Sequence, residues 1–229
     1  MNIVLHDLAG ADPALRFSPF CWRTKFALAH KGLSYEARPW RFSEHARLAA
    51  LGAEKVPVIE DGGRAINDSW AIAVYLEETY PDRPSLFGGA AGVALARFLN
   101  AWADAVLNVG ILPMVVADIW ATLGEEEQAY FRKTREARFG RTLEEIAAER
   151  EARLPAFRQS LTPLRLTLRA QPWLGGDAPN YADYIVAGSL QWARVISRFP
   201  LLADDDPLLA WFGRVLDLFG GLGAAATRV

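Results

Sequence analysis

The feature that most constrains the fold of this sequence is a change of pattern near residue 80. Before it, short β-like runs alternate with helical runs. After it, no convincing strand pattern appears, and apolar residues recur at helical spacing. Residues 81–92 lie between the two patterns and hold two prolines and three glycines among small residues, a composition typical of a domain linker. The sequence therefore predicts an α/β domain at 1–80, a linker at 81–92 and an all-α domain at 93–229.

The first domain is expected to contain a mixed β-sheet. Strand patterns occupy 2–8, 34–39, 56–60 and 64–66, and helical patterns occupy 19–31 and 69–79. Asp61, Gly62 and Gly63 separate the last two strands, and Asp-Gly between two short apolar runs is a hairpin signal. Only this pair can form a tight hairpin. The order βαβ, a loop or short helix, then ββα therefore predicts both parallel and antiparallel pairing.

The second domain is expected to be a helical bundle. Its helical patterns occupy 93–122, 125–150, 155–170, 181–197 and 207–219. Asn180 and Asp183 form a capping-box pattern before the fourth of these helices. The apolar run 98–121 is interrupted by charged and helix-breaking residues, so we interpret it as buried helix rather than a membrane span. The Arg- and Glu-rich span 132–153 is interpreted as a solvated helix face with i,i+4 ion pairs.

Charge and composition limit the partners and cofactors. The chain has 229 residues with 25 Lys+Arg against 27 Asp+Glu, and this near balance gives no electrostatic attraction to nucleic acid or to an anionic membrane. One cysteine cannot form an intramolecular disulfide, and one cysteine with three histidines argues against a dedicated zinc site. The first ten residues lack the basic start and long apolar run of a targeting segment. We expect a soluble, cytoplasmic protein that needs no metal.

The most informative motif is the run Ser-Pro-Phe-Cys-Trp-Arg at 18–23, between the first predicted strand and the first predicted helix. Pro19 suits the first helical position. The hydroxyl of Ser18 would lie beside unpaired backbone N–H groups at the positive end of the helix dipole, which favours an anion such as a thiolate. Taken alone, the simpler interpretation is that Ser18 caps the helix.

Two further motifs occur in the same domain. Pro57 interrupts the third strand pattern, which places it at an edge or a bend, and a cis bond there would turn the backbone of Val56 towards a ligand. Asp68 and Ser69 begin the second predicted helix, where backbone amides and a hydroxyl suit a carboxylate and Asp68 suits an ammonium group. An edge proline without function, and simple capping, remain the alternatives for each motif by itself.

Together and in this order, the three motifs resemble the glutathione-binding half of a cytosolic glutathione transferase of the serine type. The resemblance covers residues 3–80 strongly, and the capping-box pattern at Asn180 extends it more weakly into the helical domain. It implies a thioredoxin-like domain followed by a helical bundle. It also implies glutathione as co-substrate, a small hydrophobic electrophile, no metal, and a homodimer in which the first domain of one subunit contacts the second domain of the other.

The resemblance also implies residue roles. Ser18 would hydrogen-bond the glutathione sulfur and hold it as a thiolate. Val56, before Pro57, would pair its backbone with the cysteinyl part, and Asp68 and Ser69 would hold the γ-glutamyl ammonium and carboxylate. The residues matched to the remaining subsites are Lys55, Arg41 or His45 for the glycyl carboxylate, and Pro19, Phe20, Trp102, Asn108, Ile111 and Trp120 for the electrophile pocket. For the last four, helical spacing equally allows a role in the core.

A narrower resemblance connects residues 18–32, 68–70 and 216–219 with the bacterial lignin β-etherase branch and its fungal relatives, in which the thiolate displaces a phenol from an aryl ether. Three alternatives stay open. One is a non-catalytic glutathione- or ligand-binding protein of the same fold. Another is a structural interaction module that has lost the site. The third is a thiol transferase that uses Cys21, since the helix dipole can lower the pKa of a cysteine in the first turn. A packed structural cysteine is the simpler interpretation of Cys21.

Overall fold

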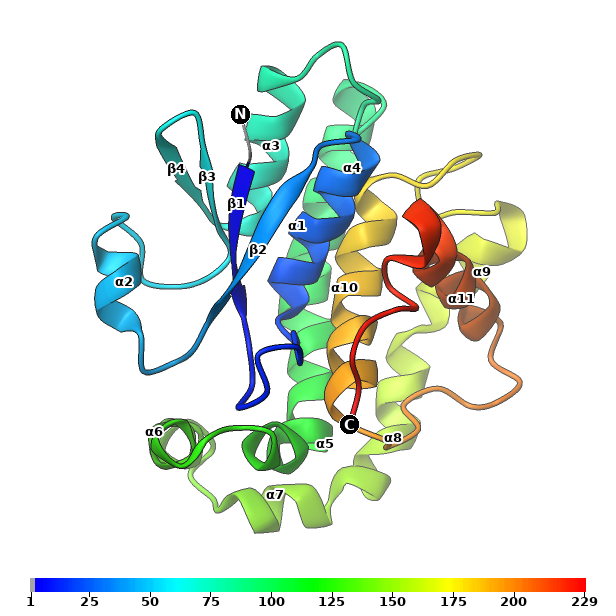
Figure 1. Ribbon diagram of the computed structural model, residues 1–229. Helices are drawn as coiled ribbons and strands as arrows, with labels where there is room; N and C mark the ends of the chain where they lie inside the picture. Colours follow the sequence, from blue (N-terminus) through cyan, green and yellow to red (C-terminus); the bar gives the residue numbers. More distant parts are fainter. Residues whose placement is uncertain (1–2) are drawn as a thin grey trace.

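The computed structural model describes residues 3–229, and its N-terminal part is a four-stranded mixed sheet (Figure 1). The strand order is β2-β1-β3-β4, with β1 parallel to β2 and the other two pairs antiparallel. In chain order the elements are β1 (Ile3–Leu8), α1 (Pro19–His30), β2 (Tyr35–Trp40), α2 (His45–Ala49), β3 (Val58–Asp61), β4 (Arg64–Asn67) and α3 (Ser69–Thr79). The predicted βαβ–ββα order is confirmed. Residue 2 of the first predicted strand lies outside the described residues.

The two central strands are buried because helices cover the sheet. Leu5 of β1 and Val58 and Ile59 of β3 have no exposed surface. Figure 1 shows α1 and α3 on one side of the sheet and α2 on the other. Strands covered in this way carry near-continuous apolar runs. Helix α1 therefore lies between the sheet and the helical bundle.

The C-terminal part is a bundle arranged around α10 (Figure 1). Its elements are α4 (Ala90–Trp102), the π-helical turn η1 (Ala103–Leu107), α5 (Asn108–Ala121), α6 (Glu125–Phe139), α7 (Leu143–Ala148), α8 (Arg150–Ser160), α9 (Thr162–Ala170), α10 (Tyr181–Ile196) and α11 (Pro207–Gly221). Every residue of α10 except Arg194 is buried. The predicted capping box is present. The side chain of Asn180 accepts a backbone N–H from the first turn of α10, and the side chain of Asp183 accepts the backbone N–H of Asn180. The predicted all-α bundle is confirmed.

Three predicted elements differ from the structure, each for a local reason. The third strand begins at Val58 rather than at residue 56, since the proline at 57 has no N–H to add to the ladder. The helix predicted over 125–150 ends at Gly140, whose φ of 68° is left-handed, and α7 restarts with a capping box at Thr142. The helix predicted over 155–170 begins earlier, at Arg150, and is divided at Leu161.

Helix α1 packs closely against α10 where the two helices cross at Gly188. A Cβ atom placed on Gly188 of α10 would lie 2.6 Å from the carbonyl oxygen of Pro19 and 3.0 Å from Cγ of Arg23. No side chain fits between these backbones without displacement of one of them. Gly188 therefore fixes the start of α1 against the bundle.

The continuous helix formed by α4, η1 and α5 is apolar on two faces. Within the described part of the chain, Ala90–Ala121 is the one stretch with the length and composition of a membrane span, and 44% of its most apolar window is buried. Its inner face belongs to the core. Its outer face carries Leu95, Phe98, Trp102 and Val106, called here the outer stripe, of which Phe98 is 67% exposed.

Replacing Gly188 with alanine is expected to lower the free energy of unfolding by about 1–3 kcal/mol, because the added methyl group overpacks the α1–α10 contact. Urea unfolding measures the change. The matched control is Gly213→Ala in α11, where no atom lies within 4 Å of the added Cβ. The control is expected to stabilise by up to ~1 kcal/mol through helix propensity. Equal effects of the two substitutions would contradict the packing argument.

Candidate active site

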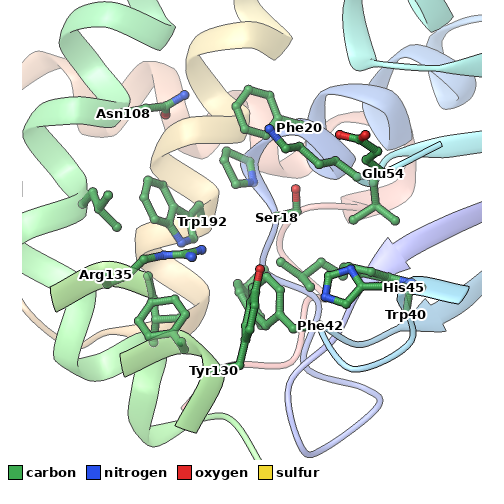
Figure 2. Close-up of a pocket in the computed structure, with 18 of the residues that line it drawn as sticks. Ser18, Phe20, Trp40, Phe42, His45, Glu54, Asn108, Tyr130, Arg135 and Trp192 are labelled. Carbon is green, nitrogen blue, oxygen red and sulfur yellow. The ribbon is translucent and has the colours of Figure 1, made fainter. Parts of the chain in front are cut away.

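A cavity of about 810 Å³ lies between the sheet domain and the bundle (Figure 2). The sheet domain contributes the start of α1, the α2 region and the segment before β3, and the bundle contributes one face of η1 and α5, together with α6 and α10. Its aromatic lining residues are Phe17, Phe20, Trp40, Phe42, Tyr130, Phe131 and Trp192. Its titratable and charged ones are His45, Glu54, Lys55, Asp104, Arg135 and Arg138. This composition suits an aromatic ligand with polar groups.

Ser18 opens into this cavity at the start of α1. It is the N-cap residue with extended backbone, its Oγ accepts the N–H of Cys21 at 3.2 Å, and Pro19 occupies the first turn. Figure 2 shows the hydroxyl oxygen of Ser18 directed into the cavity. Capping uses only an acceptor lone pair, so the O–H proton remains for a ligand. The capping and the anion-binding interpretations of Ser18 are therefore compatible.

Val56 lies on the same wall and precedes the cis peptide bond to Pro57. The sheet ladder starts at Val58, and no backbone group of residues 3–229 pairs with the backbone of Val56. An extended peptide needs free main-chain groups of this kind to add itself to an edge. Val56 therefore has free backbone groups on the same cavity wall as Ser18.

Asp68 and Ser69 do not line the cavity but lie directly beside this segment. The N–H of Asp68 donates to the carbonyl of Pro57 at 3.2 Å, which joins the start of α3 to the Val56–Pro57 segment. Oδ1 of Asp68 accepts the N–H groups of Trp70 and Ala71, both at 3.0 Å. Ser69 is buried, and its carbonyl accepts the hydroxyl of Tyr181 at 2.7 Å. The structure thus brings the three sequence motifs together.

The candidates for the remaining subsites are divided by the structure. His45 and Lys55 line the cavity, whereas the Nη2 of Arg41 donates to the carbonyl of Ala11 at 2.9 Å. Pro19, Phe20 and Asn108 also line it. Trp102, Ile111 and Trp120 do not. The reason is helical phase, because residues 104, 108 and 112 form one i,i+4 stripe towards the cavity. Ile111 lies off that stripe and has no exposed surface.

Arg23 has a role that the sequence motif did not reveal. It is fully buried, its Nη2 lies 2.9 Å from Oδ1 of Asp104, and its Nη1 donates to Asn100 at 3.0 Å. Asn108 donates to the same Asp104 oxygen at 3.3 Å. Arg23 therefore connects α1 to η1 and positions two lining residues. The available signal was a charged residue, Asp104, among the apolar residues of η1.

Cys21 is not accessible from the cavity. It has no exposed surface, it is absent from the cavity lining, and its Sγ faces the carbonyl of His6 at 3.9 Å. Burial, reinforced by the charge of Asp7, raises the pKa of the Cys21 thiol far above its ordinary value. A neutral, enclosed thiol is a poor nucleophile. The geometry gives no support to the thiol-transferase alternative.

Metal ligands do not gather in the described part of the chain. Within residues 3–229, no group of three or more His, Cys, Asp or Glu side chains has the arrangement to hold a metal ion.

Two family models match successive parts of the chain. Residues 13–84 match the N-terminal domain of glutathione S-transferases, and residues 94–199 match their C-terminal domain. The chain is also similar to a probable glutathione S-transferase, GSTU1, of Oryza sativa subsp. indica, at 32% identity over 205 residues that cover 83% of this chain and 86% of that protein. The chain belongs to the glutathione S-transferase family.

Solved structures of the family have the same architecture. A glutathione S-transferase of Ceriporiopsis subvermispora, in complex with glutathione, matches with a TM-score of 0.79 at 26% identity and covers 96% of both chains. The glutathione transferase GSTFuA3 of Phanerochaete chrysosporium matches with a TM-score of 0.78 at 28% identity, covering 100% of this chain and 98% of that one. The predicted thioredoxin-like domain followed by a helical bundle is confirmed for this member of the family.

Substituting Arg23 with methionine is expected to lower the free energy of unfolding by about 1.5–3 kcal/mol, because Asp104 and Asn100 lose a charged hydrogen-bond partner while the 41% exposed Asp104 is solvated by water. Asp104→Asn should cost more, about 3–5 kcal/mol, because it leaves the fully buried guanidinium of Arg23 without a counter-charge. Chemical denaturation of both variants and of Arg153→Met, which breaks an exposed i,i+4 pair with Glu149, measures the difference. An Arg23 effect no larger than the Arg153 effect would contradict this role.

Proposed function

We propose that this protein conjugates glutathione to a hydrophobic, aromatic electrophile, with Ser18 as the catalytic residue. The observation that carries the proposal is the hydroxyl of Ser18, which opens from the N-terminus of α1 into a cavity shared by both halves of the molecule. A hydroxyl donor and the helix dipole both stabilise a thiolate over a thiol. The bound sulfur then releases its proton and attacks the electrophile, and positioning supplies much of the rate.

In this proposal residues 1–80 bind glutathione, 81–92 are a linker, and 93–229 supply the electrophile side. The backbone of Val56 pairs with the cysteinyl part, and Asp68 and Ser69 hold the γ-glutamyl group. Lys55 and His45 are better placed for the glycyl carboxylate than Arg41, because both line the cavity. The protein acts in the cytoplasm, where glutathione maintains the thiol pool.

For the electrophile we propose aryl ethers among the aromatic candidates. The aromatic lining of the cavity suits two rings, and the resemblance of residues 18–32 to the lignin β-etherase branch points the same way. In such a reaction the carbon–sulfur bond forms as the carbon–oxygen bond breaks, and the phenol leaves with the electron pair. Screening β-aryl ethers beside halogenated nitrobenzenes tests this choice.

Replacing Ser18 with alanine is expected to lower kcat/KM about 10- to 100-fold, since a charge-assisted hydrogen bond contributes about 1.5–3 kcal/mol. Ser18→Asp keeps a capping acceptor but has no donor when ionised and should lose at least as much activity, whereas Ser18→Thr should retain most of it. Conjugation of a chlorodinitrobenzene measures activity, and ultraviolet difference spectra measure the thiolate of bound glutathione.

Three results separate the alternatives to this proposal. Full activity of Ser18→Ala with an inactive Cys21→Ala would establish the thiol transferase. Glutathione binding without turnover of any electrophile would establish a non-catalytic binding protein. Unchanged thiolate absorbance in Ser18→Ala would remove Ser18 from the catalytic role.

We also propose a homodimer in which the outer stripe of the α4–α5 helix is covered by the partner subunit. Leu95, Phe98 and Trp102 recur at three- and four-residue spacing on one helix face, and Leu95 and Phe98 are 43% and 67% exposed. A contiguous apolar patch of this kind is a feature of interaction surfaces.

Phe98→Asp is expected to convert the dimer to a monomer, because a carboxylate on the outer stripe cannot be desolvated without a partner. Light scattering coupled to size-exclusion chromatography measures the mass. The control is Leu166→Asp on α9, a residue that is 56% exposed but lies outside the stripe. If both variants remain dimers, the interface lies elsewhere. If the wild-type protein is a monomer, the homodimer proposal is wrong.

A further inference from the structure

The electrophile side of the cavity carries an arginine that no carboxylate neutralises. Arg135 lies on α6 and lines the cavity, and no Asp or Glu side chain in residues 3–229 is within ion-pair distance of it. Its neighbour Arg132 on the same helix pairs with Glu136 at 2.8 Å and Glu144 at 2.7 Å. The span 132–153, interpreted from sequence as a solvated face, is therefore solvated only in part.

Aromatic rings hold Arg135 in place without using its donors. Its guanidinium carbon lies 4.5 Å from the ring centroid of Phe131 and 5.7 Å from that of Phe42. Its one hydrogen bond to the described protein goes from Nη1 to Oγ1 of Thr134 at 2.8 Å. A guanidinium has five N–H donors, and stacking on ring faces leaves the donors at its edge free. Arg135 is thus fixed in position with most of its hydrogen-bonding capacity unused.

The free edge of Arg135 faces the cavity. Figure 2 shows its guanidinium extending beside Trp192 towards the middle of the cavity, with Ser18 on the opposite wall. The carboxylates on the lining are Asp104, which Arg23 already holds, and Glu54, which belongs to the segment before β3. Burial lowers the pKa of Arg135 from its ordinary value, so its charge is poorly solvated. An anion that reaches it gains more than it would at an exposed arginine.

We propose that the electrophilic substrate is an aromatic anion, such as an aromatic carboxylate, whose negative group binds the guanidinium of Arg135. This substrate class rests on the proposed function. The aromatic ring stacks among Phe42, Tyr130 and Trp192, and the anionic group meets Arg135. The reactive carbon then faces Ser18, where the thiolate forms the carbon–sulfur bond and the leaving group departs with the bonding electrons. Arg135 orients the substrate and takes no proton.

The test compares a chlorodinitrobenzoate with the corresponding neutral chlorodinitrobenzamide, each corrected for its uncatalysed rate with glutathione. Arg135→Met is expected to raise KM for the benzoate about 10- to 100-fold, because a charge-assisted contact is lost. KM for the amide should change by no more than about 2-fold. Arg135→Lys should recover part of the benzoate affinity, because it keeps the charge without the planar fork. The control is Lys133→Met on the same helix, which is exposed and does not line the cavity.

The same measurements separate the two sources of a carboxylate. If Arg135 instead holds a carboxylate of glutathione, Arg135→Met raises KM for glutathione with both electrophiles and leaves the benzoate-to-amide ratio unchanged, which overturns the proposal. Equal effects on benzoate and amide overturn it as well. If neither compound is turned over, the proposed function fails, and calorimetry with an unreactive dinitrobenzoate and its amide decides the anion site. The anion site is supported if the benzoate binds more strongly than the amide and Arg135→Met abolishes that difference. Equal binding of the two compounds overturns it.

Discussion

The contact between α1 and α10 is the constraint on which the rest of this structure depends. Gly188 lets the backbone of α10 approach the carbonyl of Pro19, and a Cβ there would come within 2.6 Å of it. A few residues along α1, the buried guanidinium of Arg23 binds Asp104 on η1. Two elements far apart in sequence are thereby held against the same short segment. Because packed interiors transmit displacement, a shift at either contact moves the start of α1.

The candidate site uses this constraint directly. Ser18 is the N-cap of α1, so a fixed helix start gives a fixed hydroxyl and a fixed dipole. Asp104 and Asn108 reach the cavity from the opposite side through the same arginine network. The wall that would hold glutathione and the wall that would hold the electrophile are therefore connected through Arg23. Rates that depend on holding two reactants within contact distance need such a connection.

Local chemistry explains which parts of the site could be predicted. Ser18 before Pro19, the proline at 57 and the Asp68 cap are each recognisable within a few residues, because caps and prolines act on the nearest backbone. The phase of the continuous α4–α5 helix, which decides which of its side chains face the cavity, was not recognisable in this way. Trp102 and Ile111 are as apolar as Leu112, and only packing decides which of them faces the cavity. The break at Gly140 also depended on a left-handed backbone that a glycine permits but does not require.

By itself, the sequence determined the order of strands and helices in the sheet domain, the helix start that carries Ser18, and a net charge too small to attract nucleic acid. Each follows from periodicity, capping or net charge, which act over a few residues or over the whole chain. The tertiary structure alone decided that Arg135 faces the cavity rather than solvent, and that Cys21 is enclosed. Both depend on which face of a helix packs against an element distant in sequence, and local sequence patterns do not specify such long-range contacts.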